Sequence, residues 1–390
     1  MSLNTELVKG VLVALLASAA LVHAADALRP EVSKPLLAAQ NLLKAHKPRE
    51  ALAKAVEADA VPGQTAYEGF MIAQMQAAAA QQAGATAAAA TAYTRLVESG
   101  RLPEAQQLQT IAALAGAEYQ LQRYDQALQW ANRYLKSRAG DAQMTTLAAQ
   151  SAYLVGDCRA LANAVQPGRV PEASLQLLAN CYQKQGDNAS YVSALERLVS
   201  YYPGKAYWPA LLSRIAAKSG FARERLELDV YRLRREVGDF GTADDYMQMT
   251  QLALAGGYPG EAVRVINEGF ARGALGTGDQ APRQQRLLAL SKNRLSEAGK
   301  DGGAQDAKGA DVFEQAFDAV LNGKPEGVSW METNLSQVNS NRREDARLHL
   351  GIAYFLTGQK AKAIQTFKSV KGNDGTADIA RLWAIRAQGA

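Results

Sequence analysis

The side chains best suited to covalent or metal chemistry in this chain are two cysteines and a few histidines. The cysteines are Cys158 and Cys181, and the histidines beyond residue 24 are His46 and His349. A cysteine nucleophile needs a histidine base beside it, and a zinc site needs several such ligands together. Neither histidine lies near both thiols in the sequence. We therefore predict no cysteine–histidine pair, no histidine-based serine triad and no metal site.

Two other patterns resemble catalytic motifs only in composition. The glycine-rich run 273–278 would cradle a phosphate if it followed a strand, but no strand-like segment precedes it. The paired acids Asp244-Asp245 and Glu344-Asp345 stand at expected helix starts. Carboxylates at such positions bind free backbone amides and complement the helix dipole. We therefore predict that the protein is not an enzyme and carries no cofactor.

The composition favours helices. Hydrophobic residues make up 48% of the chain and aromatic residues only 7%, since alanine supplies much of the apolar share. Alanine, leucine and glutamine are good helix formers, and no segment shows the alternation of a half-buried strand. The net charge of +5 is not concentrated in a basic stripe, which argues against nucleic acid as a partner.

The first 24 residues have the pattern of a secretory signal peptide. Lys9 precedes an apolar run over residues 11–22, and Val22-His23-Ala24 matches the small-x-small cleavage pattern. The run is shorter than the roughly 20 residues of a membrane-spanning helix. We expect cleavage after residue 24, export to the periplasm and no integral membrane segment afterwards. An uncleaved N-terminal anchor is the alternative.

A helix–turn–helix pattern recurs along the chain. Its clearest copy contains Leu350-Gly351, Tyr354, Gly358, Ala363 and Phe367. A copy that begins at Leu114-Ala115, and one shifted by a full repeat to Ala148-Ala149, place a small residue, an aromatic residue and a turn in the same order. Small residues fall where two helices approach closely, and large ones fill the gaps between pairs.

This pattern resembles the tetratricopeptide repeat, and the chain is similar to exported bacterial proteins built from that repeat. The resemblance is most specific over residues 350–367 and moderate over 114–203. It implies an all-α fold, a right-handed α-solenoid of helix–turn–helix repeats. Residues 202–208 and 245–270 are also similar to repeat proteins encoded beside TonB–ExbB–ExbD systems of Gram-negative bacteria.

The sequence is expected to divide into four parts. These are a signal peptide at 1–24, an N-terminal tetratricopeptide-like solenoid at 25–298, a glycine-rich linker or loop at 299–310, and C-terminal tetratricopeptide-like helices with a capping helix at 311–390. Glycine and polar residues concentrated over 300–310 are typical of a mobile connection. Whether the two helical parts stack continuously stays open.

The resemblance implies that the first helix of each pair lines a concave face that contacts a partner. The inward positions of the central repeats are expected to be Tyr119, Gln120, Gln150, Tyr153, Asn180, Gln183 and Lys184. Amides and phenols can hydrogen-bond an extended peptide and also offer apolar area. The alternative is that the two tyrosines pack between neighbouring first helices and that the polar residues are plain surface.

The two cysteines are expected to form a disulfide. Cys158 stands at the start of one second helix and Cys181 lies in the next first helix. Successive helices of such an array pack together, so the bridge is geometrically plausible. Export to an oxidising compartment favours paired cysteines over free ones.

Together these features predict a periplasmic, non-catalytic scaffold that binds other proteins or extended peptides of the cell envelope. The narrower resemblance adds a role in TonB-linked outer-membrane transport. One alternative is an adaptor that binds peptidoglycan or another glycan, which would need exposed aromatic residues such as Tyr207 and Trp208. A second is an enzyme whose reactive groups are assembled across repeats.

Overall fold

The computed structural model describes residues 27–165, 170–301 and 309–389. Within these ranges the regular elements are helices, and no strand is present. The predicted all-α fold class is therefore confirmed. The expected signal peptide, residues 1–24, lies outside the described residues, as do residues 302–308 of the expected linker.

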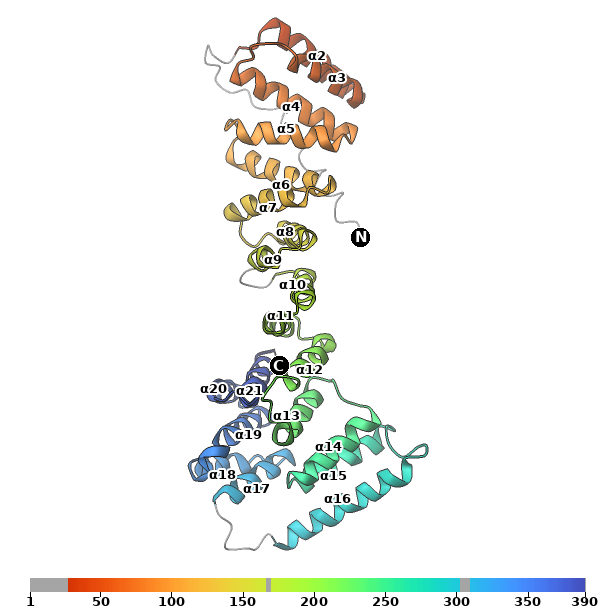
Figure 1. Ribbon diagram of the computed structural model, residues 1–390, viewed down its shortest axis with the longest axis vertical. Coiled ribbons are helices and arrows are strands. Elements are labelled where there is room, and N and C mark those ends of the chain that lie inside the picture. The colour runs from red at the N-terminus through yellow and green to blue at the C-terminus, as the bar shows by residue number, and fades with distance from the viewer. Residues whose placement is uncertain (1–26, 166–169, 302–308, 390) are drawn as a thin grey trace. The chain divides into compact units, whose positions relative to one another are not determined.

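The chain forms two compact units, the first ending at Gly186 and the second beginning at Asp187. In the first unit short turns join the helices, and each helix packs against the next (Figure 1). Its helices are α2 (Pro30–Lys44), α3 (Pro48–Asp59), α4 (Ala66–Ala83), α5 (Thr86–Glu98), α6 (Glu104–Gln120), α7 (Tyr124–Ser137), α8 (Ala142–Val155), α9 (Cys158–Ala164) and α10 (Glu172–Gln185).

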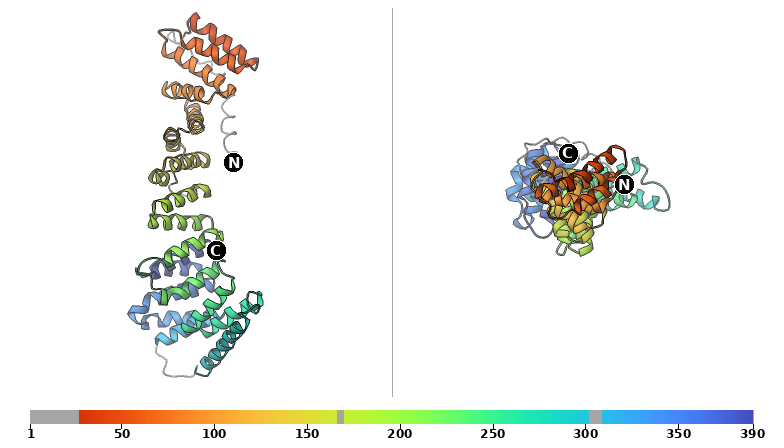
Figure 2. Two further views of the ribbon diagram at one scale, coloured as in Figure 1. Left: turned by 45° about the vertical axis from the view of Figure 1, so that its right-hand side comes forward. Right: turned by 90° about the horizontal axis from the view of Figure 1, so that it is seen from above.

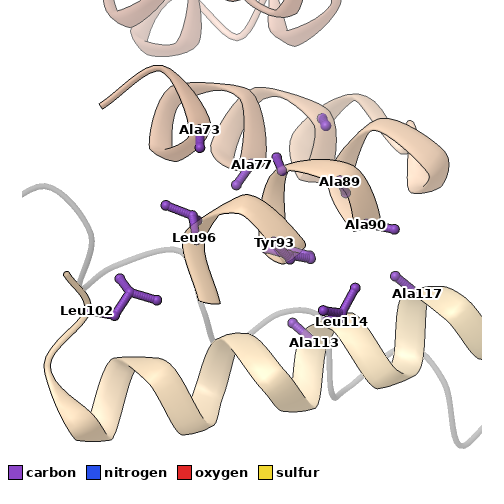
Figure 3. Packing of buried hydrophobic residues seen from close by; sticks show 12 residues of the cluster. Ala73, Ala77, Ala89, Ala90, Tyr93, Leu96, Leu102, Ala113, Leu114 and Ala117 are labelled. Carbon is purple, nitrogen blue, oxygen red and sulfur yellow. The ribbon is translucent and has the colours of Figure 1, made fainter. Parts of the chain in front are cut away.

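Alanine allows the helices of the first unit to approach one another closely. Most buried residues between α4, α5 and α6 are alanines, and Tyr93, Leu96 and Leu114 fill the remaining space (Figure 3). The buried Tyr93 hydroxyl donates a hydrogen bond to Gln81 Oε1 at 2.9 Å, so its polar group is satisfied inside the core. Packing of this density leaves little room for larger side chains.

Specific residues stop and start these helices. Gly84 ends α4 with a φ of 67°, and Gly156 ends α8 with a φ of 78°. This left-handed conformation is readily adopted only by glycine, and it turns the chain tightly into the second helix. At the start of α4, Thr65 and Glu68 form a capping box in which each side chain binds the other's backbone N–H.

A disulfide joins α9 to α10. Cys158 is the first residue of α9 and Cys181 lies within α10, and both are buried. The bridge spans 23 residues of sequence, and residues 166–169 of that span lie outside the described residues. Since α9 has only seven residues, too few to be a stable helix by itself, this link holds it against its neighbour.

The second unit repeats the arrangement of paired helices and adds three short 3-10 helices. Its elements are α11 (Asn188–Tyr201), η2 (Lys205–Tyr207), α12 (Trp208–Ala216), α13 (Arg223–Glu236), α14 (Ala243–Ala255), α15 (Pro259–Ala271), α16 (Ala281–Asp301), α17 (Gly309–Leu321), α18 (Gly327–Asn334), η3 (Leu335–Gln337), η4 (Ser340–Arg342), α19 (Arg343–Leu356), α20 (Lys360–Ser369) and α21 (Thr376–Gly389).

The last helix returns to the beginning of the second unit. It packs on α11 and α13 as well as on α19 and α20 (Figure 1, Figure 2). The ion pairs across this contact are Lys218–Asp378 at 2.8 Å, Arg381–Glu196 at 2.8 Å and Arg386–Glu236 at 2.9 Å. Trp383 is buried at 1% exposure. The helix expected as an unpaired terminal cap is thus packed on two sides and closes the second unit on itself.

The segment 299–310, expected to separate two helical parts, falls inside the second unit. Helix α16 extends to Asp301 and α17 begins at Gly309. Side chains from before and after the segment are in contact: the Tyr258 hydroxyl donates to a Glu314 carboxylate oxygen, and Asn322 lies against Gly260. The helices on either side of the segment therefore share one packed core.

The clearest repeat copy contains a close approach at a glycine. A Cβ atom added at Gly351 in α19 would lie 2.4 Å from Cε1 of Phe367 in α20. The Phe367 ring is itself buried at 2% exposure. The glycine of this copy therefore stands where the first helix approaches the second helix closely, as the repeat pattern predicts.

We expect Gly351→Ala to lower the free energy of unfolding by about 1–3 kcal/mol, because the added methyl overpacks a fixed ring. Gly116→Ala in α6 is the matched control, since a Cβ there meets nothing within 4 Å. That variant should gain about 0.5–1 kcal/mol from helix propensity. Urea unfolding followed by circular dichroism measures both, and equal effects of the two changes would contradict the packing argument.

We expect replacement of both cysteines by alanine to lower the free energy of unfolding by about 2–4 kcal/mol, because the unfolded chain is then no longer closed into a loop. Urea unfolding with and without a reducing agent gives the measurement. The reducing agent should weaken the native protein and leave the double variant unchanged. A native protein indifferent to reduction would show that the bridge does not stabilise the fold.

Candidate functional site

The seven residues expected to face a partner lie on three consecutive first helices of the first unit. Helices α6 and α8 pack together, as do α8 and α10. Tyr119, Gln150 and Tyr153 are partly buried, whereas Gln120, Asn180, Gln183 and Lys184 are exposed. We call these seven residues the first-helix face. Each of them is accessible to a partner, at least in part.

Two of these residues, one from α8 and one from α10, contact each other directly. Lys184 Nζ donates a hydrogen bond to the Tyr153 hydroxyl at 2.6 Å and lies 4.7 Å from the centroid of the tyrosine ring. A cation held over an aromatic ring at an exposed site is stabilised by about 0.5–1 kcal/mol. The contact fixes the direction of a flexible lysine and leaves its charge at the surface.

The residues on α6 make contacts of a different kind. The Tyr119 ring meets Tyr124 of α7 edge to face, with centroids 5.4 Å apart. Burial raises the pKa of Tyr119, and the neighbouring Tyr124 adds to the effect. Gln120 Oε1 accepts a hydrogen bond of 3.5 Å from Thr86 Oγ1 at the start of α5. Tyr119 therefore supports its own helix pair through a contact with a second helix, which differs from the packing between neighbouring first helices kept open above.

The sequence argument missed an apolar neighbour of the first-helix face. Leu154 of α8 is 49% exposed, which is unusual for a large aliphatic residue at a helix end that packs on other helices. It stands four residues after Gln150, and side chains four apart on a helix share one side. Its position beside Tyr153 is the only signal in the sequence that points to it. Leu154 adds apolar area next to the hydrogen-bonding groups.

The structure also contains a cleft in the second unit that was not predicted from the sequence. A cavity of about 320 Å³ opens between α12 and α13, with Leu212, Phe221, Val230 and Tyr231 among its apolar lining residues. Charged residues at its rim pair with one another, as in the Arg234–Asp239 ion pair at 3.1 Å and the Arg223–Glu227 pair at 3.8 Å. The cleft therefore offers apolar surface, and these four charged residues at its rim neutralise one another in pairs.

Trp208, one of the two aromatic residues expected to bind a glycan, is not accessible to a ligand. Trp208, the first residue of α12, is buried at 2% exposure. Tyr207 before it is partly buried. A sugar ring stacks on the exposed face of an aromatic side chain, and Trp208 offers none. The expected alternative of a glycan-binding adaptor loses one of its two proposed contact residues.

The described ranges contain neither a metal-binding group nor a membrane-spanning helix. Within residues 27–165, 170–301 and 309–389 no three histidine, cysteine or acidic side chains are grouped so as to hold a metal ion. In those same ranges, every helix is too short or too polar to cross a lipid bilayer.

Comparison with known proteins identifies the repeat in two places. The profile of the tetratricopeptide repeat family matches residues 173–205, which contain α10 and α11, and residues 345–374, which contain most of α19 and all of α20. A comparison with curated proteins gives no match.

Similar solved structures include Naa15/Naa10 bound to HypK-THB, with 16% identity over 87% of this chain and 58% of that chain, and a TM-score of 0.28. They also include the TPR domain of P58(IPK), with 13% identity over 92% of this chain and 98% of that chain, and a TM-score of 0.20. This chain thus spans less than two thirds of the first of these. At such TM-scores neither likeness bears on the fold or the function. The two profile matches and the paired helices identify this chain as an all-α protein that contains tetratricopeptide repeats.

Proposed function

We propose that this protein is a non-catalytic scaffold that binds other proteins or extended peptides through its first-helix face. Tetratricopeptide repeats are protein-interaction modules. The observation that carries the proposal is the profile match over residues 173–205, because it includes α10 with the exposed Asn180, Gln183 and Lys184.

The chemistry of this face suits a peptide backbone. Exposed amide groups of Gln120, Asn180 and Gln183 offer both donors and acceptors, and Leu154 and Tyr153 offer apolar area. Because Lys184 is already held by Tyr153, little side-chain entropy is lost when a partner engages it. The packing of α6 on α8 and of α8 on α10, together with the disulfide that joins α10 to α9, lowers the cost of association in the same way.

We further propose that the scaffold works in the periplasm and supports TonB-linked outer-membrane transport. The signal-like pattern at 1–24 supports export. The disulfide supports it independently, because such bonds persist in oxidising compartments and are rare in the cytosol. The transport role has weaker support, the sequence similarity at 202–208 and 245–270. The glycan-binding alternative has less support, since Trp208 is buried.

Photo-crosslinking in living cells tests the binding face. A photoreactive residue in place of Gln183 should capture particular envelope proteins, identified by mass spectrometry, whereas one in place of Gln129 on the second helix α7 should not. Both positions are exposed, so they differ in face and not in accessibility. Identical products from the two positions, or none above background, would remove the proposal.

Once a partner is captured, we expect Tyr153→Ala to weaken its binding about tenfold or more, because loss of an aromatic anchor commonly costs more than about 1 kcal/mol. Isothermal titration calorimetry measures the change. Gln129→Ala is the control and should bind as the native protein does. A Tyr153 variant of unchanged affinity would assign that ring to packing alone.

Cell fractionation tests the location. We expect the mature chain in the periplasmic fraction. Its measured mass should be that of a chain whose first residue is Ala25, because the small residues at 22 and 24 match a cleavage site. A full-length chain in the membrane fraction would instead favour the uncleaved anchor. A chain that stays in the cytosol would contradict export altogether.

A further inference from the structure

His349 of α19 lies at the centre of the second unit, away from water. The residue is 4% exposed. Its ring stacks on Phe317 of α17, with centroids 4.4 Å apart and an angle of 12° between the planes. Tyr258, just before α15, meets the ring edge to face at 6.4 Å. A titratable side chain is thus enclosed where most proteins place an apolar one.

Both nitrogens of this ring face carboxylates. Nε2 lies 3.3 Å from Asp229 of α13, and Nδ1 lies 3.5 Å from Glu314 of α17, at ion-pair distance but without a hydrogen bond. A neutral imidazole carries one N–H, so one of its nitrogens would present a lone pair to a carboxylate. Only the imidazolium form offers a proton to each side. The geometry therefore fits a charged ring that links α19 to α13 and α17.

Charged groups surround the ring on several helices. Arg232 of α13 donates to Asp229 and to Glu261 of α15, at 2.7 Å in each case. Arg342 lies 3.7 Å from Glu314. Arg264 of α15 lies near both Glu261 and Arg232 and interacts with their charges. The carboxylates nearest the ring itself are Asp229, which is buried, and Glu314, which is 31% exposed. An opposite charge at this distance favours the charged form of a titratable group, so these two carboxylates stabilise the imidazolium.

Other titratable groups border the cluster on each helix that packs against it. Tyr258 donates its hydroxyl proton to Glu314, and burial raises the pKa of Tyr258 well above its usual value. On α19 itself, Asp345 is paired with Arg225 of α13. On α17, burial and then the nearby Glu261 raise the pKa of Asp318.

We propose that protonated His349 is a latch that holds helices α19–α21 closed on the rest of the second unit, and that loss of its proton at alkaline pH loosens these helices. The latch joins residues 120 positions apart in the sequence. Helix α19 carries it and packs on α21. Release of α19 therefore frees the helix that covers α11 and α13.

The pKa values place the transition between neutral and alkaline pH. Burial lowers the pKa of His349, but Asp229 and Glu314 outweigh it and raise the pKa to about 9, above the value near 6.5 of an unfolded histidine. A raised folded-state pKa gives stabilisation that is complete below about pH 6.5 and lost as the pH rises through about 9. Asp229 and Glu314, with pKa values of about 2, stay ionised throughout this window.

Two ion pairs of α21 lie near the surface, while Arg386–Glu236 and the buried Trp383 hold this helix more firmly. In its pairs, Lys218 is 49% exposed and Arg381 is 46% exposed. Exposed pairs of this kind contribute little to stability and are screened by salt. None of these contacts contains a histidine, so the His349 cluster is the part of this closure that changes charge near pH 9.

Nitrogen NMR of the full chain labelled at histidine tests the protonation state directly. We expect His349 to be doubly protonated at pH 7 and to lose its proton with a midpoint near 9. The His23→Gln and His46→Gln variants assign the signals, because both residues precede the second unit in the sequence. A ring that is neutral at pH 7 would overturn the proposal without any dependence on a variant that folds.

Pulsed hydrogen exchange tests the loosening. After correction for intrinsic exchange rates, protection of α19–α21 should fall about tenfold or more between pH 6.5 and 9.5, the loss expected for a shift of more than one pKa unit. Helices α4–α7 of the first unit serve as the internal reference and should show no such step. Protection of α19–α21 that parallels this reference would overturn the proposal.

The variant Glu314→Gln separates a latch from a merely structural contact. Removing one carboxylate should lower the titration midpoint of His349 by about one pH unit or more, and the exchange step should move with it. Glu297→Gln, at a side chain 59% exposed on α16, should change neither. An exchange step that stays in place while the midpoint moves would contradict the coupling between them.

Discussion

Close approach of paired helices is the constraint on which this fold depends. At the position where two helices come closest, only glycine or alanine fits. A ring or a leucine from the adjacent helix then fills the space beside that small residue. In the first unit Ala73 and Ala77 face Tyr93 and Leu96 in this way. In the second unit Gly351 leaves space that the Phe367 ring occupies. Interiors packed at crystal-like density make this pattern sensitive to single methyl groups.

The two units extend this shared packing in different ways. The first unit continues from pair to pair, and each helix meets the next along the chain. The second unit brings its last helix back onto α11 and α13. Its interior holds charged groups from α13, α15, α17 and α19. A buried ionic network is weak evidence for stability, but breaking one partner is costly. Such a network favours one arrangement of helices over others that apolar packing alone would permit.

The first-helix face has features of both a packing surface and a binding surface. Tyr119 packs against its own helix pair, while Tyr153 holds Lys184 in a defined position at the surface. The disulfide between Cys158 and Cys181 fixes α10, which presents part of this face, to the short helix before it. Covalent and packing restraints therefore act on the same helices that carry the accessible amides. Preorganisation of this kind suits a scaffold whose task is to hold a partner without changing it.

The sequence by itself determined the helix pairs, their turns and their small contact positions, because these depend on residues within one repeat. The pairing of the cysteines was predictable for the same reason, since the helices that carry them are neighbours. Only the tertiary structure decided that helices before and after residues 299–310 share a packed core and that α21 turns back onto α11 and α13. It also decided the role of His349, which in the sequence is one polar residue on a first helix. Its partners Asp229 and Glu314 lie in other repeats, and no periodic pattern reports a contact across 120 residues. Local propensity and spacing carry information about neighbours along the chain, whereas burial of charge depends on how distant helices meet.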